Sequence, residues 1–212
     1  MLGFNLRDAL TKRSAKVSAE GAVSIVAHPH PPKDEPEHPL PYRQYMTDTG
    51  ASTGTISMKA VGSAAAPLTF FVCPQNVDRD LYVGRLDIVI ADASAALNKF
   101  GNITALTNGC RLEWFTQEFG VVVIHDALQS NWDFVRLSGG KNSFGATTTA
   151  FRASNVFGSS EGYIPCIDFD EIFNLQWGLR LRKGTTDCLR LIIQDDTTGV
   201  DQFDAIAYGI EF

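Results

Sequence analysis

The sequence predicts an all-β protein, a jelly-roll-like β-sandwich with an extended proline-rich N-terminal arm. Short apolar runs recur at nearly regular spacing, turn-forming residues separate them, and few segments have helical periodicity. The 14 phenylalanines also favour pleated, half-buried surfaces. Parallel α/β folds are excluded because the chain lacks crossover helices.

The body of the sandwich is expected to span residues 55–212. Strands are predicted at residues 55–61, 67–73, 81–91, 110–116, 118–125, 132–137, 147–152, 163–169, 175–183, 187–194 and 204–212. Leu179 and Leu181 share one face of their strand while Arg180 takes the other, as expected for a half-buried strand. Only residues 92–100 and 170–174 have helical character.

An N-terminal arm, residues 1–54, precedes the body. Residues 1–17 are expected to form a short, basic, amphipathic helix, and residues 22–27 a short strand. Residues 28–42 hold six of the nine prolines, so this stretch should be stiff and polyproline II-like. It should lie outside any sheet, because proline cannot donate to a β-ladder.

The composition limits the class of function. A net charge of −6 argues against coating nucleic acid, which requires a basic surface. Charged residues interrupt the first 17 positions and no run of 18 apolar residues exists, so neither a signal peptide nor a membrane span is expected. The cysteines form no CxxC pair and are expected to be reduced residues of an apolar core: Cys73, Cys110, Cys166 and Cys188.

The histidines do not predict a catalytic or metal site. His28, His30 and His38 lie in the proline-rich stretch, which offers no rigid frame for a ligand set, so exposed linker histidines are expected. His125 is followed by Asp126, but no nucleophile motif accompanies them. A histidine at a strand end, bonded to a neighbouring acid, explains this pair.

Two acidic clusters leave alternatives open. Asp168 and Asp170 are expected on one strand face with Glu171 close by, where they could bind calcium or act as glycosidase carboxylates. The second cluster surrounds a Thr-Thr-Gly turn and could bind calcium: Asp195, Asp196, Asp201 and Asp204. Neither matches the EF-hand pattern. Turn and solvent-face acids explain both clusters, so no catalytic residue, cofactor or metal ion is expected.

Four segments in order along the chain carry a resemblance to a known family. They are LTFFV at 68–72, LYVGRLDIVI at 81–90, NITALTNGCRL at 102–112 and LRLIIQDDTTG at 189–199, followed by a final strand ending at Phe212. On these segments, residues 55–212 resemble small virion structural proteins of tailed bacteriophages. The resemblance implies a β-sandwich packing subunit with no catalytic residues.

The leading hypothesis is therefore a non-enzymatic virion protein at the neck, collar or capsid surface, synthesised in the host cytoplasm. Its expected partners are copies of itself, in a closed ring or trimer, and other virion proteins such as capsid, portal or connector, but neither nucleic acid nor membrane. The arm is expected to anchor it through apolar Leu2, Phe4, Leu6 and Leu10 and through basic Arg7, Lys12 and Arg13.

The alternative is a carbohydrate-binding jelly-roll module that recognises a host receptor. An exposed Trp114, Trp132 or Trp177 would then stack on sugar, although the apolar surroundings of all three favour core packing. A glycoside hydrolase using Asp168 or Asp170 is a third possibility.

Overall fold

The computed structural model describes residues 5–7, 14–17, 23–26, 38–92, 96–138, 148–152 and 161–212. The chain divides into two compact units, Met1–Glu37 and His38–Phe212. Every described pair of neighbouring strands in either unit is antiparallel. The predicted all-β class is confirmed.

The first unit contains a three-stranded sheet in the order β1-β2-β3. Its strands are β1 (Asn5–Arg7), β2 (Ser14–Val17) and β3 (Val23–Val26). The helix predicted over residues 1–17 is thus wrong for β1 and β2, because β2 pairs along its whole length with β3. Val23 and Ile25 in β3 are β-branched and favour this pairing over a weak helical pattern. The strand predicted at 22–27 is confirmed as β3.

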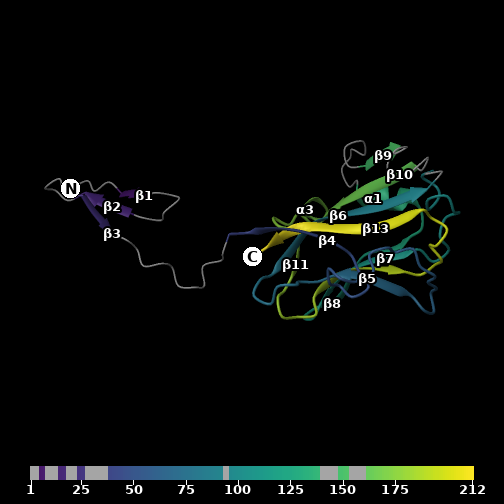
Figure 1. The fold of residues 1–212 in the computed structure, drawn as a ribbon, viewed down its shortest axis with the longest axis horizontal. Coiled ribbons are helices and arrows are strands. Elements are labelled where there is room, and N and C mark those ends of the chain that lie inside the picture. Colours follow the sequence, from purple (N-terminus) through teal and green to yellow (C-terminus); the bar gives the residue numbers. More distant parts are fainter. Residues whose placement is uncertain are drawn as a thin grey trace. The chain divides into compact units, whose positions relative to one another are not determined.

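The larger sheet of the second unit has the order β4-β13-β6-β10-β9 (Figure 1). Its strands are β4 (Leu40–Tyr45), β13 (Gln202–Glu211), β6 (Leu81–Asp92), β10 (Glu161–Asp168) and β9 (Thr148–Arg152). The short β11 (Leu179–Leu181) pairs with the start of β6, while β10 pairs with the rest of it.

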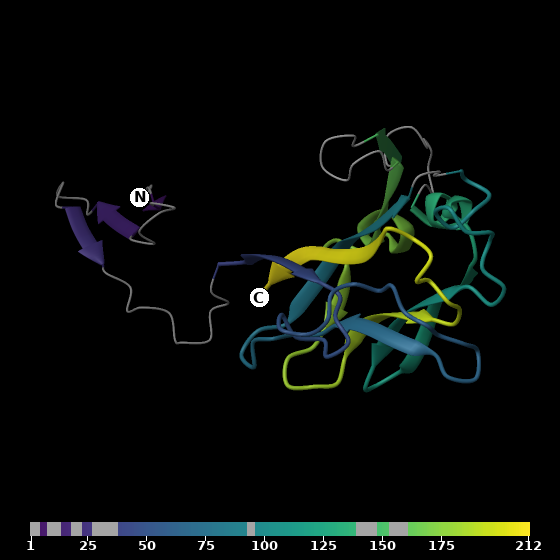
Figure 2. The same ribbon diagram turned by 45° about the vertical axis from the view of Figure 1, so that its right-hand side comes forward.

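The smaller sheet has four strands in the order β5-β12-β7-β8. These are β5 (Leu68–Val72), β12 (Cys188–Ile193), β7 (Cys110–Thr116) and β8 (Gly120–Leu128). The two sheets form separate layers (Figure 2). Strands β5 to β10, β12 and β13 confirm the predictions at 67–73, 81–91, 110–116, 118–125, 147–152, 163–169, 187–194 and 204–212. The strand predicted at 175–183 is confirmed only for residues 179–181, which form β11.

One buried cluster joins both layers. It includes Leu189 and Leu191 of β12, Phe203 of β13 and Phe100 from the segment before β7, all fully buried. Phe100 meets Phe203 edge-on, with ring centroids 5.0 Å apart. Side chains from both layers therefore fill a common interior, as in a β-sandwich.

A β-bulge keeps the long strand β6 facing this interior. Arg85 pairs with Tyr208 and Val83 with Gly209, so Gly84 is an extra residue without a partner in β13. The extra residue shifts the alternation of inward-facing and outward-facing side chains along β6 by one position. Val83 before it and Leu86 after it are consequently both fully buried.

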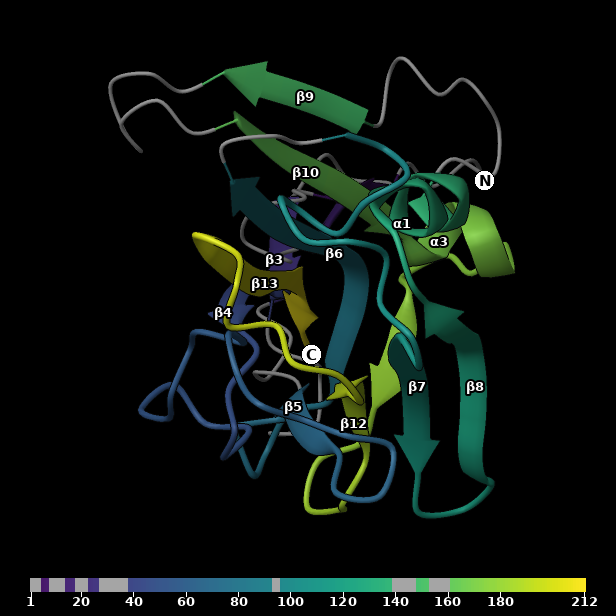
Figure 3. The ribbon, with the colours of Figure 1, turned by 90° about the vertical axis from the view of Figure 1, so that its right-hand side faces the viewer.

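The described residues of the second unit also include two short helices, α1 (Asn131–Ser138) and α3 (Phe169–Phe173) (Figure 3). The strand predicted at 132–137 is wrong, because Asn131, Phe134 and Val135 are the buried residues, a helical spacing. Helix α1 packs against β10 of one sheet and β8 of the other. Helix α3 confirms the helical character predicted at 170–174.

Two further predictions fail. Residues 55–61 form no strand beyond a single bridge between Val61 and Asp196. Met58 is fully buried instead, and its main-chain N–H donates to the carbonyl of Phe203 at 2.8 Å. In the helix predicted at 92–100, Asp92 instead ends β6. Residues 96–100 form a turn whose Leu97 and Lys99 carbonyls accept from the first N–H groups of α1.

Residues 38–54 belong to the body and not to the arm. Strand β4 pairs with β13 from Leu40 opposite Glu211 to Tyr45 opposite Ile206. Pro41 is tolerated there because β4 is the edge strand of its sheet. The compact unit accordingly begins at His38 and not at Thr55, the start expected from the sequence.

Candidate ligand-binding site

An open surface depression of about 450 Å³ lies between the segment around residue 98 and the start of α1. It is lined by Leu97, Asn98, Ala105, Gln129, Ser130, Trp132 and Asp133. The lining combines one large aromatic ring with amide, hydroxyl and carboxylate groups. Such a set can hold a ligand that has both an apolar face and hydrogen-bonding groups.

The carboxylate of Asp133 caps the start of α1, next to the depression. One carboxylate oxygen of Asp133 accepts hydrogen bonds from the main-chain N–H of Gln129 at 3.1 Å and of Ser130 at 3.0 Å. The Ser130 hydroxyl lies 3.0 Å from the same oxygen. Asn131, which is buried, donates its side-chain amide to the carbonyl of Ala96 at 3.1 Å. These contacts tie the helix start to the neighbouring segment.

Trp132 is the residue that gives the depression its aromatic wall. Its side chain is 43% exposed, and Trp177 is 46% exposed. Core packing, expected for all the tryptophans, is therefore wrong for these two. Trp132 is the second residue of α1 and lies on the side of the helix that faces solvent. Trp177 meets the ring of Phe212 edge-on near the end of β13, with ring centroids 5.6 Å apart. Trp114 is half-buried and packs against the core, as expected.

The first acidic cluster serves the fold and does not form a pair of facing acids. Asp168 ends β10 and caps α3, accepting from the N–H groups of Asp170 at 3.0 Å and Glu171 at 3.2 Å. The expected shared strand face of Asp168 and Asp170 is wrong, because the helix begins between them at Phe169. Burial and the nearby charge of Asp168 raise the pKa of Asp170.

The second acidic cluster also has local partners. Asp195 accepts from the main-chain N–H groups of Asn108 at 2.9 Å and Gly109 at 2.6 Å. Asp196 accepts from the hydroxyl and N–H of Thr198, which lowers its pKa. Within the described ranges no three His, Cys, Asp or Glu side chains lie close enough together to hold a metal ion. No structural observation therefore favours calcium at this turn.

The described histidines contribute no reactive group to the depression. The main-chain carbonyl of His38 accepts from Arg79 at 3.4 Å, and His28 and His30 lie outside the described residues. His125 is half-buried in β8, where its Nδ1 has no hydrogen-bond partner in the part of the chain that the structure describes. The bond to a neighbouring acid that the sequence led us to expect is absent at this nitrogen.

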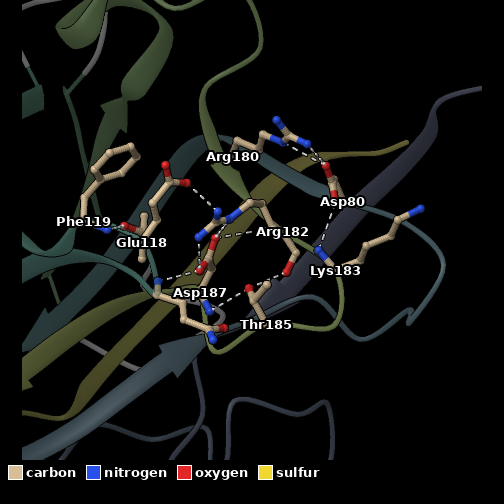
Figure 4. A network of polar contacts seen from close by, with 10 residues as sticks. Asp80, Glu118, Phe119, Arg180, Arg182, Lys183, Thr185 and Asp187 are labelled. Atoms are coloured by element: carbon tan, nitrogen blue, oxygen red, sulfur yellow. Dashed lines mark hydrogen bonds and ion pairs between the residues drawn. The ribbon is translucent and has the colours of Figure 1, made fainter.

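A buried carboxylate, that of Asp187, joins two turns at one end of the smaller sheet (Figure 4). Asp187 is fully buried, and its two oxygens accept from the N–H of Gln117 at 2.8 Å and from Nε of Arg182 at 2.8 Å. Burial alone would raise the pKa of Asp187, but these hydrogen bonds lower it to about 2. Arg182 also reaches Glu118 at 2.7 Å, so one arginine joins two turns.

Next to this network lies an exposed apolar edge. Phe119, at the β7–β8 turn, is 73% exposed, and the consecutive Val121, Val122 and Val123 of β8 are exposed as well. Strand β8 is the last strand of its sheet. An apolar edge strand of this kind is a surface at which proteins associate.

The anchoring role of the arm residues stays a prediction, because none of their side chains is among those that the structure describes. Leu6 and Arg7 lie in β1, but the structure does not describe their side chains. The other anchors lie outside the described residues: Leu2, Phe4, Leu10, Lys12 and Arg13.

No described helix has the length and hydrophobicity needed to span a membrane. Comparisons of the chain with protein-family models, with curated proteins and with solved structures found no match.

Proposed function

We propose that this chain is a non-enzymatic, jelly-roll structural subunit of a tailed-phage virion, placed at the neck, collar or capsid surface. The pairing of strands is the observation that carries the proposal. Strand β4 pairs with β13, β5 with β12, β6 with β10, and β7 with β8. This nested order is what results when one long antiparallel ribbon folds over itself.

Folding of such a ribbon gives a jelly roll, in which nested pairs alternate between two sheets. The orders β4-β13-β6-β10 and β5-β12-β7-β8 support this topology, with β9 added at one edge. Jelly rolls are frequent in viral capsid proteins and in lectins. Because one fold serves several functions, the strand order supports a virion subunit but does not decide between this class and the others that use the fold.

Two features of the chain support a role as a subunit of a larger assembly. The first 37 residues form a compact unit of their own. In the proposal this N-terminal unit is the arm that binds a neighbouring virion protein. The exposed apolar edge at β8 supports packing of the body against further copies of itself.

Quantitative mass spectrometry of particles purified from the phage that encodes the chain tests the proposal. Hundreds of copies per particle would indicate a capsid decoration protein. A copy number that matches a single ring would indicate a protein of the neck or tail. Absence from the particle would overturn the proposal. A variant lacking residues 1–37 should keep a folded body but no longer incorporate, and normal incorporation would overturn the anchoring role.

The exposure of Trp132 favours a second candidate, a carbohydrate-binding module. Aromatic rings bind the apolar face of a sugar, while Asn98 and Gln129 could meet its hydroxyl groups. A glycan array probed with the full chain tests this candidate. Binding should be lost in Trp132→Ala and retained in Trp177→Ala, a matched control because Trp177 is equally exposed but lies outside the depression. Equal loss in both variants, or no binding at all, would exclude it.

A further inference from the structure

Two cysteines distant in the sequence lie opposite each other at one end of the β5–β12 ladder. The register pairs Val72 of β5 with Leu189 of β12. Cys73 directly follows β5, and Cys188 is the first residue of β12. Extending the antiparallel register by one residue beyond Val72 and Leu189 places Cys73 opposite Cys188.

The two side chains also project to the same side of the sheet. Val72 and Leu189 are both fully buried and point into the sandwich. Successive residues of a strand point to opposite faces, so Cys73 and Cys188 both point to the outer face. Both are free thiols in the structure.

The separation of opposite residues suits a covalent bridge. Directly opposite residues of an antiparallel pair have Cα atoms about 4.5–5.5 Å apart. Disulfides span Cα separations of about 4.4–6.8 Å. A bridge between these positions therefore needs only small side-chain adjustments and no movement of the strands.

Both cysteines lie in segments held by other contacts. Asp187, directly before Cys188, is fixed by Gln117 and Arg182. The thiol of Cys73 donates to the carbonyl of Gly50 at 3.4 Å. The reaction partners are thus held near one another before any bond forms.

We propose that Cys73 and Cys188 form a cross-strand disulfide when the folded protein meets a low-molecular-weight disulfide such as oxidised glutathione. This modification site goes beyond the function proposed above and does not depend on it. Cys73 is half-buried and Cys188 is buried, so Cys73 is the residue that an external disulfide reaches first.

The chemistry proceeds in two exchanges. The Cys73 thiolate attacks one sulfur of oxidised glutathione, which forms a mixed disulfide and releases one glutathione thiolate. The Cys188 thiolate then attacks Sγ of Cys73, which forms the protein disulfide and releases the second glutathione. The two thiol protons pass through solvent to the released glutathiones, and the two electrons lost by the cysteine pair reduce the oxidant.

The rate should rise with pH, because the thiolate is the nucleophile. Burial raises the pKa of Cys73 above its ordinary value. Burial also raises the pKa of Cys188, to about 11, although the charge of Arg190 opposes this rise. Oxidation should accordingly be slow near neutral pH and faster under mildly alkaline conditions.

The chain supplies its own controls in the other two cysteines. Cys110 is fully buried in the interior and pairs with Ile193 at the other end of β12. Cys166 lies in β10 of the other sheet. Neither has a cysteine opposite it in its ladders.

Peptide mapping under non-reducing conditions tests the proposal on the full chain after incubation with oxidised glutathione. Trypsin places Cys73 in residues 60–79 and Cys188 in residues 184–190, apart from the other two cysteines. The expected result is one dominant cross-link between these two peptides, formed in the native protein but not selectively in urea. The bridge should also raise the unfolding temperature by roughly 5–10 °C, reversibly with dithiothreitol.

Variants separate a specific bridge from general thiol oxidation. Cys73→Ser and Cys188→Ser should each abolish the cross-link and the thermal shift, whereas Cys110→Ser and Cys166→Ser should retain both. Stable glutathione adducts on Cys73 without a cross-link would overturn the proposal. So would unreacted thiols, or a cross-link that forms as readily in urea as in the native protein.

Discussion

Nε of Arg182 lies 2.8 Å from Oδ2 of Asp187, and the main-chain N–H of Arg182 donates to the same oxygen at 3.1 Å. The other oxygen of Asp187 accepts from Gln117, in the β7–β8 turn. One fully buried carboxylate therefore joins the turn before β12 to the turn before β8. A buried charge with this many partners is costly to disturb, because its partners lose their acceptor together.

Asp187→Asn should lower the free energy of unfolding by about 2–3 kcal/mol. The asparagine side chain keeps one oxygen, but its NH₂ group replaces the other and cannot accept the hydrogen bonds that Gln117 and Arg182 donate. Urea unfolding at neutral pH measures the effect. Asp126→Asn, at an exposed carboxylate of β8, should change stability by less than about 0.5 kcal/mol. Equal effects of the two substitutions would show that the buried contacts contribute little.

The stabilising effect of Asp187 should depend on pH. Its pKa is about 2 in the folded protein, below the value of about 3.9 expected for an unfolded chain. A lowered pKa stabilises the folded state at pH values above the unfolded pKa, and this stabilisation is lost as the pH falls toward 2. The stability difference between wild type and Asp187→Asn should accordingly shrink between about pH 5 and pH 2. A difference that stays constant over this range would contradict the assignment.

Glu113 provides a comparison between a buried and an exposed ion pair. It is almost fully buried, and Arg111 and Arg190 both contact its carboxylate. Glu113→Gln should destabilise the fold by about 2–3 kcal/mol, because two arginines lose their counter-charge. Glu118→Gln breaks an exposed pair with Arg182 and should cost less than about 1 kcal/mol. Chemical unfolding of the two variants side by side measures the contrast.

Gly209 is required because two strands approach closely at the bulge. A Cβ atom at this position would overlap the carbonyl oxygen of Tyr82. Gly209→Ala should therefore prevent folding or destabilise it by more than about 3 kcal/mol. Gly184 has a positive φ of 65° but open space around it, so Gly184→Ala should cost only about 1 kcal/mol. Thermal unfolding distinguishes the two, and a folded, stable Gly209→Ala would disprove the close approach.

Two truncations locate the start of the body. Removal of residues 1–37 should leave the unfolding temperature of the body unchanged, because both sheets begin after this point. Removal of residues 1–45 also deletes β4 and exposes one edge of β13, so this variant should aggregate or unfold at lower temperature. Size-exclusion chromatography and thermal unfolding give the comparison. Equal behaviour of the two variants would place β4 outside the folded body.

Local patterns sufficed to predict strands whose residues alternate between interior and surface. β11, with Leu179 and Leu181 buried and Arg180 exposed, is the simplest case. Helix α1 was mistaken for a strand because Trp132, Phe134 and Leu137 resemble a β-rich run. The signal that identifies the helix was present in the Ser130-x-x-Asp133 capping box, which the structure uses to start α1.

Features that depend on tertiary position could not be read from the chain. Trp132 is exposed because of the way α1 packs across the two sheets, which no local pattern contains. The juxtaposition of Cys73 and Cys188 depends on the register of strands far apart in the sequence. β4 was assigned to the arm because the prolines of residues 28–42 argue against a strand, whereas an edge position accommodates Pro41.

The position of β13 has a consequence for synthesis on the ribosome. This strand lies between β4 and β6, so the larger sheet lacks a central member until residues 202–211 have been translated. Until then β4 and β6 each expose an unpaired edge. Contacts between strands far apart in the sequence, such as β4 and β13, are slow to form, so folding of the body is expected to wait for β13 and to take milliseconds to seconds, typical of all-β domains. The nascent body is therefore most prone to aggregate before β13 has been translated.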